Sequence, residues 1–234
     1  MRSLGIVPGV ISFNAAISAC KTSGKWEHAI ELLNEMRSQG ITPDIISFTS
    51  VISACKIGGK WERALELLDE MRSLGIVPDI ISFTSVISAC GKSGHWVRAH
   101  QLLDEMRSLG IVPGVISFNA AILACGNGGK WERALELLVE MRTLGIAPDV
   151  VSFGAAISAC KTGGKWELAL KLLDEMRSHG IAPNLVIFSA AISACEKSGE
   201  CKRANELLDE MRSQGLTPNV VSFSPATSVC IKGG

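Results

Sequence analysis

The residues with the most chemistry to offer are the cysteines, and seven of the eight recur 35 residues apart, from Cys20 to Cys230. Thiols bind zinc and pair as disulfides, so a regular row of them first points to metal binding or cross-linking. Thiolates on one zinc ion must reach it at about 2.3 Å, whereas equivalent residues on neighbouring parallel helices are held about 8–10 Å apart. We therefore expect small buried cysteines, with Cys195 and Cys201 as the one pair across a turn that could form a disulfide.

Other reactive side chains do not assemble into a site. The glutamates recur at i and i+4, which is typical of a solvated helix face. No glycine-rich phosphate loop, nucleophile elbow or carboxylate pair stands outside the repeating pattern. The four histidines occupy four different positions of the 35-residue period: His28, His95, His100 and His179. We therefore predict no catalytic residues, no metal, no cofactor and no small-molecule substrate.

The 35-residue period extends to other residue types and divides the chain into repeats. All seven Phe, all seven Met and all five Trp follow it, and a period of 20–50 residues indicates a solenoid. Six complete repeats cover residues 10–44, 45–79, 80–114, 115–149, 150–184 and 185–219, with partial repeats at 1–9 and 220–234. Because the chain starts and stops inside repeats, we expect a single array over 1–234 that is part of a longer one.

Each repeat contains two predicted helices. In repeat 45–79, one apolar helical face is formed at i, i+3, i+4 and i+7 by Phe48, Val51, Ile52 and Cys55. This helix ends near 56–59, where glycine permits a left-handed backbone. The second helix runs from about 60 to 73, and its apolar stripe consists of Trp61, Ala64, Leu65, Leu68 and Met71. A loop at 75–79 follows, because proline cannot continue a helix.

A single hairpin of this kind cannot bury its apolar face, but stacked copies can. The predicted fold class is therefore all-α, a right-handed α-solenoid superhelix of stacked helix-turn-helix repeats with one concave surface. The 23 basic and 23 acidic residues give zero net charge, which excludes a generally polycationic nucleic-acid binder. Residues 108–129 carry no charge, as in a membrane span. Pro113 and Gly114 interrupt that stretch, and aligned repeats carry Asp there, so we expect no membrane association.

Two positions vary from repeat to repeat within a narrow polar set. The fifth residue, after each Phe, is Asn14, Thr49, Thr84, Asn119, Gly154 and Ser189 in the six complete repeats. The last residue, after each loop Pro, is Asp44, Asp79, Gly114, Asp149, Asn184 and Asn219. Asn, Thr, Ser and Gly are poor helix formers, so helix stability does not explain the fifth residue.

The fifth residue is predicted to lie off the buried stripe, one turn after an aliphatic second residue. These second residues are Ile11, Ile46, Ile81, Ile116, Val151, Val186 and Val221. An apolar side chain followed by a small hydrogen-bonding group, once per repeat, suits a row of flat ligands with polar edges, such as unstacked bases. Ordinary helix capping by Asp or Asn, and a simple polar surface, are alternative explanations of the same residues.

Charge is distributed unevenly between the two predicted helices. Most acidic residues lie in the second helices, so the first helices present an acid-poor face. Lysines gather in the turn between the helices, beside the positive N-terminal end of the second helix, which favours phosphate. They are Lys21, Lys25, Lys56, Lys60, Lys92, Lys130, Lys161 and Lys165, with Lys197 in the sixth repeat. The Trp stripe could stack on bases, but its spacing with Ala and Leu favours core packing.

The sequence resembles the pentatricopeptide repeat family over essentially the whole chain. The resemblance rests on the 35-residue length, the Ala-x-Glu-Leu-Leu-x-Glu-Met block and the Gly-x-x-Pro-Asp loop. It implies single-stranded RNA binding with one base per repeat. The fifth and last residues would read the base, and the second would clamp it by van der Waals contact.

Carried over repeat by repeat, the resemblance predicts a target sequence. Asn14 with Asp44, and Asn119 with Asp149, imply U. Thr49 with Asp79 implies G, and Ser189 with Asn219 implies A. The pairs Thr84 with Gly114 and Gly154 with Asn184 depart from the family pattern, so the expected target is U-G-x-U-x-A.

The resemblance also implies a place of action, a mitochondrion or a chloroplast, and a role in RNA processing, stability or translation. The alternative from a different class is a helical scaffold that binds a protein or peptide partner in its groove. A third is a gene fragment without independent function. Salt dependence separates the first two, because binding of single-stranded RNA weakens with a log-log slope of about −0.7 per neutralised phosphate.

Overall fold

The computed structural model describes residues 9–217, which contain α-helices and no strand. The first helices of the repeats are α1 (Val10–Ser23), α3 (Ile45–Ile57), α5 (Ile80–Ser93), α7 (Val115–Asn127), α9 (Val150–Thr162) and α11 (Leu185–Lys197). The second helices are α2 (Trp26–Ser38), α4 (Trp61–Ser73), α6 (Trp96–Ser108), α8 (Trp131–Thr143), α10 (Trp166–Ser178) and α12 (Cys201–Ser213). The predicted pair of helices in every complete repeat is confirmed.

Local signals set the helix ends. Asp44 caps α3, because its carboxylate accepts from the Ser47 backbone N–H at 2.8 Å while the Ser47 hydroxyl accepts from the Asp44 N–H at 3.2 Å. The helix α4 ends where Gly75 takes a φ of +73°, a left-handed conformation that favours glycine. The Ile76 N–H then donates to the Met71 carbonyl at 2.9 Å.

The core consists of the residues that carry the 35-residue period. Phe48, together with its equivalents in the four following repeats, is 0% exposed, and so is Met71. Burying such side chains contributes about 1.5–3 kcal/mol each. One detail of the predicted stripe is wrong: Leu67 is buried in α4, whereas Leu65 is half-buried. Packing against the neighbouring repeat buries a wider face of α4 than the pattern within a single hairpin predicts.

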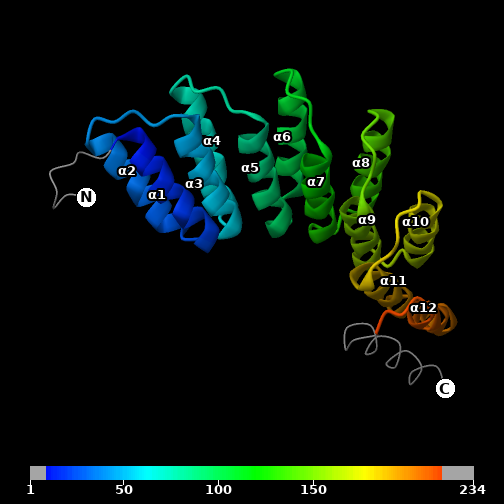
Figure 1. Ribbon diagram of the computed structural model, residues 1–234. Coiled ribbons are helices and arrows are strands. Elements are labelled where there is room, and N and C mark those ends of the chain that lie inside the picture. The colour runs from blue at the N-terminus through cyan, green and yellow to red at the C-terminus, as the bar shows by residue number, and fades with distance from the viewer. Residues whose placement is uncertain (1–8, 218–234) are drawn as a thin grey trace. The chain divides into compact units, whose positions relative to one another are not determined.

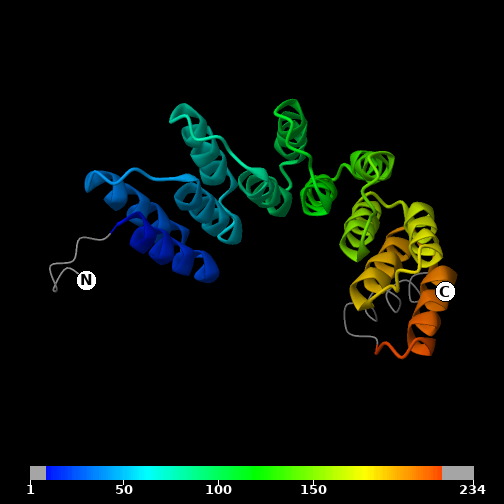
Figure 2. The same ribbon diagram turned by 45° about the horizontal axis from the view of Figure 1, so that its top comes forward.

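The chain divides into two compact units, one of residues 1–93 and 97–113, the other of residues 94–96 and 114–234. In the first unit α3 packs against both α1 and α5 (Figure 1). In the second unit α9 packs in the same way against α7 and α11, as Figure 2 shows from another side. A second helix packs on its own first helix and on the first helix of the next repeat, as α4 does on α3 and α5. The predicted stacking of hairpins is confirmed within each unit.

Ion pairs link the second helices of successive repeats. Within the first unit, Arg37 pairs with Glu70 at 2.6 Å and Arg72 pairs with Glu105 at 2.5 Å. The second unit repeats the pattern with the pairs Arg142–Glu175 and Arg177–Glu210, both at 2.5 Å. The same arginines also cover the buried phenylalanine of the next repeat, and Arg72 lies 5.5 Å from the Phe83 ring centre. Each arginine therefore joins three helices.

The tryptophans pack between repeats, which confirms the core-packing interpretation. A Cβ atom added to Gly58 would lie 2.5 Å from Cδ1 of Trp26, so only glycine fits beside this ring. The Lys60 ammonium lies 5.2 Å from the centre of the same ring. Lys165 lies 4.9 Å from the Trp131 ring in the second unit. The tryptophans are half-buried, and the contacts of Trp26 and Trp131 with the next repeat favour a packing role over base stacking.

Candidate nucleic-acid interface

The second residue of each complete repeat is a large aliphatic side chain exposed to solvent. Ile11 is 86% exposed, and the others described are 56–70% exposed: Ile46, Ile81, Ile116, Val151 and Val186. Val221 lies outside the described residues. Ile11 and Asn14 are three residues apart on α1, so the second and fifth residues share a helix face. A large apolar side chain exposed at the same place in every repeat indicates a contact surface.

The fifth residue of the first repeat contacts the last residue of the same repeat. The Nδ2 atom of Asn14 donates to the Oδ1 atom of Asp44 at 3.1 Å, and the Ser47 hydroxyl donates to Oδ1 of Asn14 at 2.6 Å. These residues come from α1, from the loop before α3, and from α3 itself. Two residues 30 positions apart in the sequence, to which the resemblance assigns one base, are thus in contact.

The fourth repeat has the same arrangement. Nδ2 of Asn119 donates to Oδ1 of Asp149 at 3.0 Å, and the Ser152 hydroxyl donates to Oδ1 of Asn119 at 2.5 Å. Desolvation raises the pKa of the Asp149 carboxyl, but hydrogen bonds from Ser152 and Asn119 outweigh it and hold this pKa below its ordinary value. The pKa of Asp44 is lowered by the same balance, with Ser47 and Asn14 as donors. Both carboxyls are therefore anionic at neutral pH.

The second repeat replaces the amide by a hydroxyl. Oγ1 of Thr49 lies 2.8 Å from Oγ of Ser82, whose hydroxyl donates to Oδ1 of Asp79 at 2.7 Å. Here the serine stands between the fifth and the last residue, so Thr49 reaches Asp79 only through it. Thr49 is half-buried, with part of its surface still open to solvent.

The remaining fifth and last residues are less alike. Thr84 and Gly154 are half-buried, and Ser189 donates to the Leu185 carbonyl of its own helix at 2.7 Å. Gly114 begins α7 without a side-chain cap, whereas the Asn184 side chain caps α11. Asn219 lies outside the described residues.

The predicted position of the fifth residue off the buried stripe is wrong in two repeats. Asn119 is 8% exposed and Ser189 is 6% exposed. The next first helix covers Asn119, as the contact of its side chain with Ser152 on α9 demonstrates. Helical periodicity within one repeat carries no information about this cover.

Helix capping and contact with the fifth residue turn out to be compatible. Oδ1 of Asp44 accepts both from the Ser47 backbone and from the Asn14 amide. Oδ1 of Asp44 therefore both caps α3 and holds the fifth residue.

The lysines of the turns lie at the surface, and some of them are near one another. Lys21, Lys25, Lys60, Lys92, Lys130 and Lys165 are exposed, and Lys56 and Lys161 are half-buried. Burial lowers the pKa of Lys56, and the positive charges of Lys21 and Lys92 lower it further. The first unit thus concentrates positive charge at the end of α3.

The repeated cysteines from Cys20 to Cys195 are buried thiols, as expected, and Cys201 is half-buried. The disulfide left open for Cys195 and Cys201 is not formed. Burial raises the pKa of Cys55, Cys90, Cys125, Cys160 and Cys195 to about 11. Such thiols are protonated at neutral pH and poor metal ligands. Over residues 9–217 no group of three or more His, Cys, Asp or Glu is placed to hold a metal ion.

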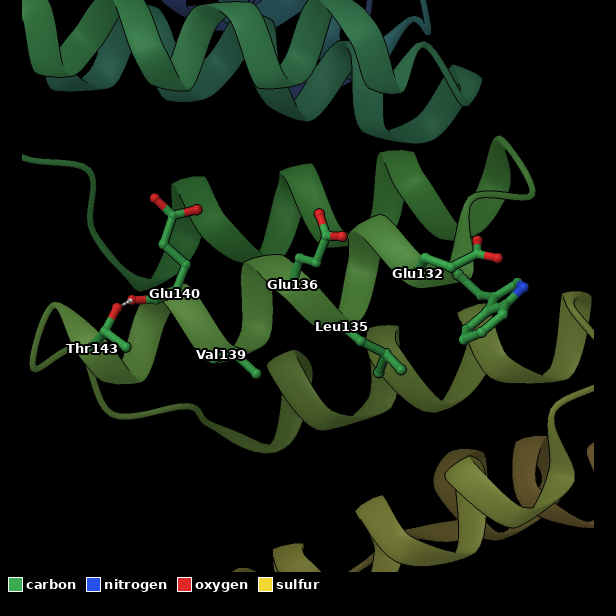
Figure 3. A pocket seen from close by; sticks show the side chains of 7 residues that line it. Glu132, Leu135, Glu136, Val139, Glu140 and Thr143 are labelled. Atoms are coloured by element: carbon green, nitrogen blue, oxygen red, sulfur yellow. Dashed lines mark hydrogen bonds between the residues drawn. The ribbon is translucent and has the colours of Figure 1, made fainter.

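A shallow pocket on α8 is a poor place for RNA. Its lining runs along one helix, where Figure 3 shows Leu135 and Val139 beside carboxylates. Trp131 also lines the pocket. The carboxylates belong to Glu132, Glu136 and Glu140, and Thr143 closes one end. Three acidic groups repel phosphate, so the first helices remain the favoured interface. Among helices of residues 9–217, none combines the length and apolarity needed to cross a bilayer.

Comparison with protein families identifies the class of protein to which this arrangement belongs. The model described as "Pentatricopeptide repeat domain" matches residues 1–60, 31–93, 66–128 and 136–198. Models described as "PPR repeat family" and "PPR repeat" match residues 183–226 and 116–146. The chain therefore belongs to the pentatricopeptide repeat family. No curated protein matches the sequence.

Solved structures of pentatricopeptide repeat proteins are similar to the chain. One is PPR10 from maize, with 26% identity over 96% of this chain and 32% of that chain and a TM-score of 0.69. Another is PPR10 in complex with an 18-nucleotide psaJ RNA element, with 27% identity over 94% of this chain and 36% of that chain and a TM-score of 0.60. This chain thus spans about a third of PPR10.

A third similar structure supports the fold alone. It is the PPR domain of Arabidopsis thaliana protein-only RNase P 1 in complex with tRNA. The identity is 17% over 77% of this chain and 95% of that chain, with a TM-score of 0.65.

Proposed function

We propose that this chain binds single-stranded RNA and reads one base per repeat. The observation that carries the proposal is the row of exposed aliphatic second residues, each one turn from a fifth residue that is polar in every complete repeat except 150–184. Equivalent positions on packed helices lie about 8–10 Å apart. A flat base between two aliphatic side chains needs about 3.5–4 Å on each side, so it matches this interval. The similarity to PPR10, whose structure is known with a bound RNA element, supports the same function.

Base selection falls to the fifth and last residues, in the order U-G-x-U-x-A. Asn14 and Asn119 select U, Thr49 selects G, and Ser189 with Asn219 selects A. The two open positions belong to repeats 80–114 and 150–184. Asp44 and Asp149 act by holding the amide of the fifth residue, as Asp44 holds that of Asn14.

The lysines contact the RNA phosphates. Lys21, Lys56 and Lys92 supply positive charge at the end of the first helices in the first unit. The acidic second helices repel phosphate, which directs the RNA towards the first helices. The net charge of zero is compatible with this division.

The chain acts by binding rather than by catalysis, and its cellular role is in organellar RNA processing, stability or translation, in a mitochondrion or a chloroplast. Family membership supports this assignment.

Selection from a randomised RNA pool tests the proposal, first with the wild type and then with Asn14→Thr and Asn119→Thr. The preferred base should change from U to G at the first position in one variant and at the fourth position in the other. Each variant is the control for the other, because the base at the unaltered repeat should stay U. Affinity should fall steeply with salt, as expected for phosphate contacts. An unchanged base preference, or no affinity at low salt in folded protein, would contradict the proposal.

A further inference from the structure

The third residue of a repeat contacts the fifth residue of the repeat before it. We propose that this third residue is a positioning residue, which sets the hydrogen-bonding groups that the fifth residue offers to a base. The inference rests on the proposed function. The contacts join Ser47 to Asn14 at 2.6 Å, Ser82 to Thr49 at 2.8 Å and Ser152 to Asn119 at 2.5 Å. All three serines are 0% exposed, so their hydroxyls are unavailable to RNA.

With asparagine, the serine completes a fixed amide orientation. The Asp44 carboxylate only accepts hydrogen bonds, so it must face the amide nitrogen of Asn14. The Ser47 hydroxyl lies 2.6 Å from Oδ1 of Asn14 and 2.9 Å from Oδ1 of Asp44. Its one hydrogen goes to Asn14, because two oxygens 2.6 Å apart require a hydrogen between them and Oδ1 of Asn14 carries none, whereas Oδ1 of Asp44 already accepts from the Ser47 backbone N–H. A reversed amide would place its oxygen against the carboxylate. Asn14 therefore keeps one N–H and one lone pair for a ligand, which match the O4 acceptor and the N3–H donor of uracil.

With threonine, the same serine produces a different result. The Ser82 hydroxyl has one hydrogen, and the Asp79 carboxylate, 2.7 Å away, takes it, because Thr49, unlike Oδ1 of Asn14, can supply the hydrogen for its own contact with Ser82. Thr49 then donates its own hydrogen to Ser82 and offers only lone pairs outward. An acceptor of this kind matches the N1–H and N2–H donors of guanine. One serine thus makes asparagine a donor with an acceptor, and threonine an acceptor.

Repeat 150–184 has no polar side chain at its fifth position. Gly154 has no side chain, and the residue 33 positions later is Ile187 instead of serine. A Cβ atom added to Gly154 would lie 3.5 Å from Cγ1 of Ile187, so isoleucine fills the space beside it. The polar fifth residue and its positioning serine are replaced together. Repeat 150–184 therefore accepts any base.

The inference is tested with Ser82→Ala in the full chain, using RNAs that differ only at the second base. Loss of one hydrogen bond should reduce the preference for G over U about fivefold. Ser85→Ala is the matched control, because Ser85 is also buried on α5 and its hydroxyl lies 3.3 Å from that of Ser53, away from Thr49. An unchanged preference in Ser82→Ala, or an equal loss in both variants, would overturn the inference.

A gain of preference provides a test that does not depend on weakening the cap of α5. Gly154→Asn with Asn184→Asp introduces an asparagine and an aspartate at the fifth base. A preference for U there should appear when Ile187→Ser is added and be at least about fivefold weaker without it. If the preference for U at the fifth base is the same with and without Ile187→Ser, while Asn14→Thr still changes the preferred first base, the inference is overturned and the proposed function stands. If Asn14→Thr has no effect, the proposed function and the inference both fail.

Discussion

The first and second helices of a repeat are similar in length but differ in what surrounds them. In α7, nine of 13 residues are buried, whereas α8 buries Ala134, Leu137, Leu138 and Met141. A first helix such as α9 packs against first helices on two sides, and its remaining surface is the narrow strip with Val151. A second helix keeps a broad surface of charged residues. The contrast fits the proposal that RNA contacts the few exposed positions of the more buried helix.

The largest expected effect is a difference in stability between substitutions at two positions of α5 that are two residues apart. Phe83 is 0% exposed and Ile81 is 58% exposed. Phe83→Ala should reduce the free energy of unfolding by about 3–5 kcal/mol, because it leaves a cavity. Ile81→Ala should change it by less than about 0.5 kcal/mol and yet weaken RNA binding. Urea unfolding and RNA titration of both variants measure this, and equal stability losses would contradict the division between core and contact surface.

A smaller effect concerns the thiols of the first helices at alkaline pH. The folded pKa of Cys90 is about 11, above its usual value of 9.0, because burial disfavours the thiolate. The protonated Cys90 thiol therefore makes its full contribution to the free energy of unfolding below about pH 9. This contribution is lost as the pH rises towards 11, because the unfolded chain releases the proton first. Between pH 9 and 11, the free energy of unfolding should fall less steeply with pH in Cys90→Ala than in the wild type. The two slopes should differ by up to about 1.4 kcal/mol per pH unit. Parallel pH dependences would contradict the burial of this thiol.

The smallest effect belongs to the second helices. Arg72→Met should reduce the free energy of unfolding by about 1 kcal/mol, because it removes the ion pair with Glu105 and the contact with the Phe83 ring. Arg63 on the same helix pairs only with the exposed Glu66, so Arg63→Met should have almost no effect. Thermal unfolding at low and high salt distinguishes the two. RNA base preference should be unchanged in both.

Much of the fold follows from sequence periodicity. The helix pair of repeat 45–79, its glycine-rich turn and its Phe48 core were all predictable, because each depends on residues within a few positions of one another. The exposed Ile46 and the pairing of Asn14 with Asp44 were predictable through the family resemblance. The resemblance supplied their roles, and the structure adds the distance between them.

The position of Ser47 was not predictable in this way. It reads as one more helix-start serine, since serine is common there and stands at the same place in most repeats. One signal was available: Ile187 breaks the serine series in the repeat that follows Gly154. Without coordinates, nothing connects two residues 33 positions apart.

The order of amino acids alone was enough to specify helices, turns and buried stripes, because these depend on hydrogen bonds and spacings within one repeat. Packing of one repeat on the next established which side chains share a hydrogen bond. It covers Asn119, selects Leu67 over Leu65, and joins Arg72 to Glu105. Such contacts depend on the distance and rotation between adjacent helices, and these are outcomes of side-chain packing over the whole stack.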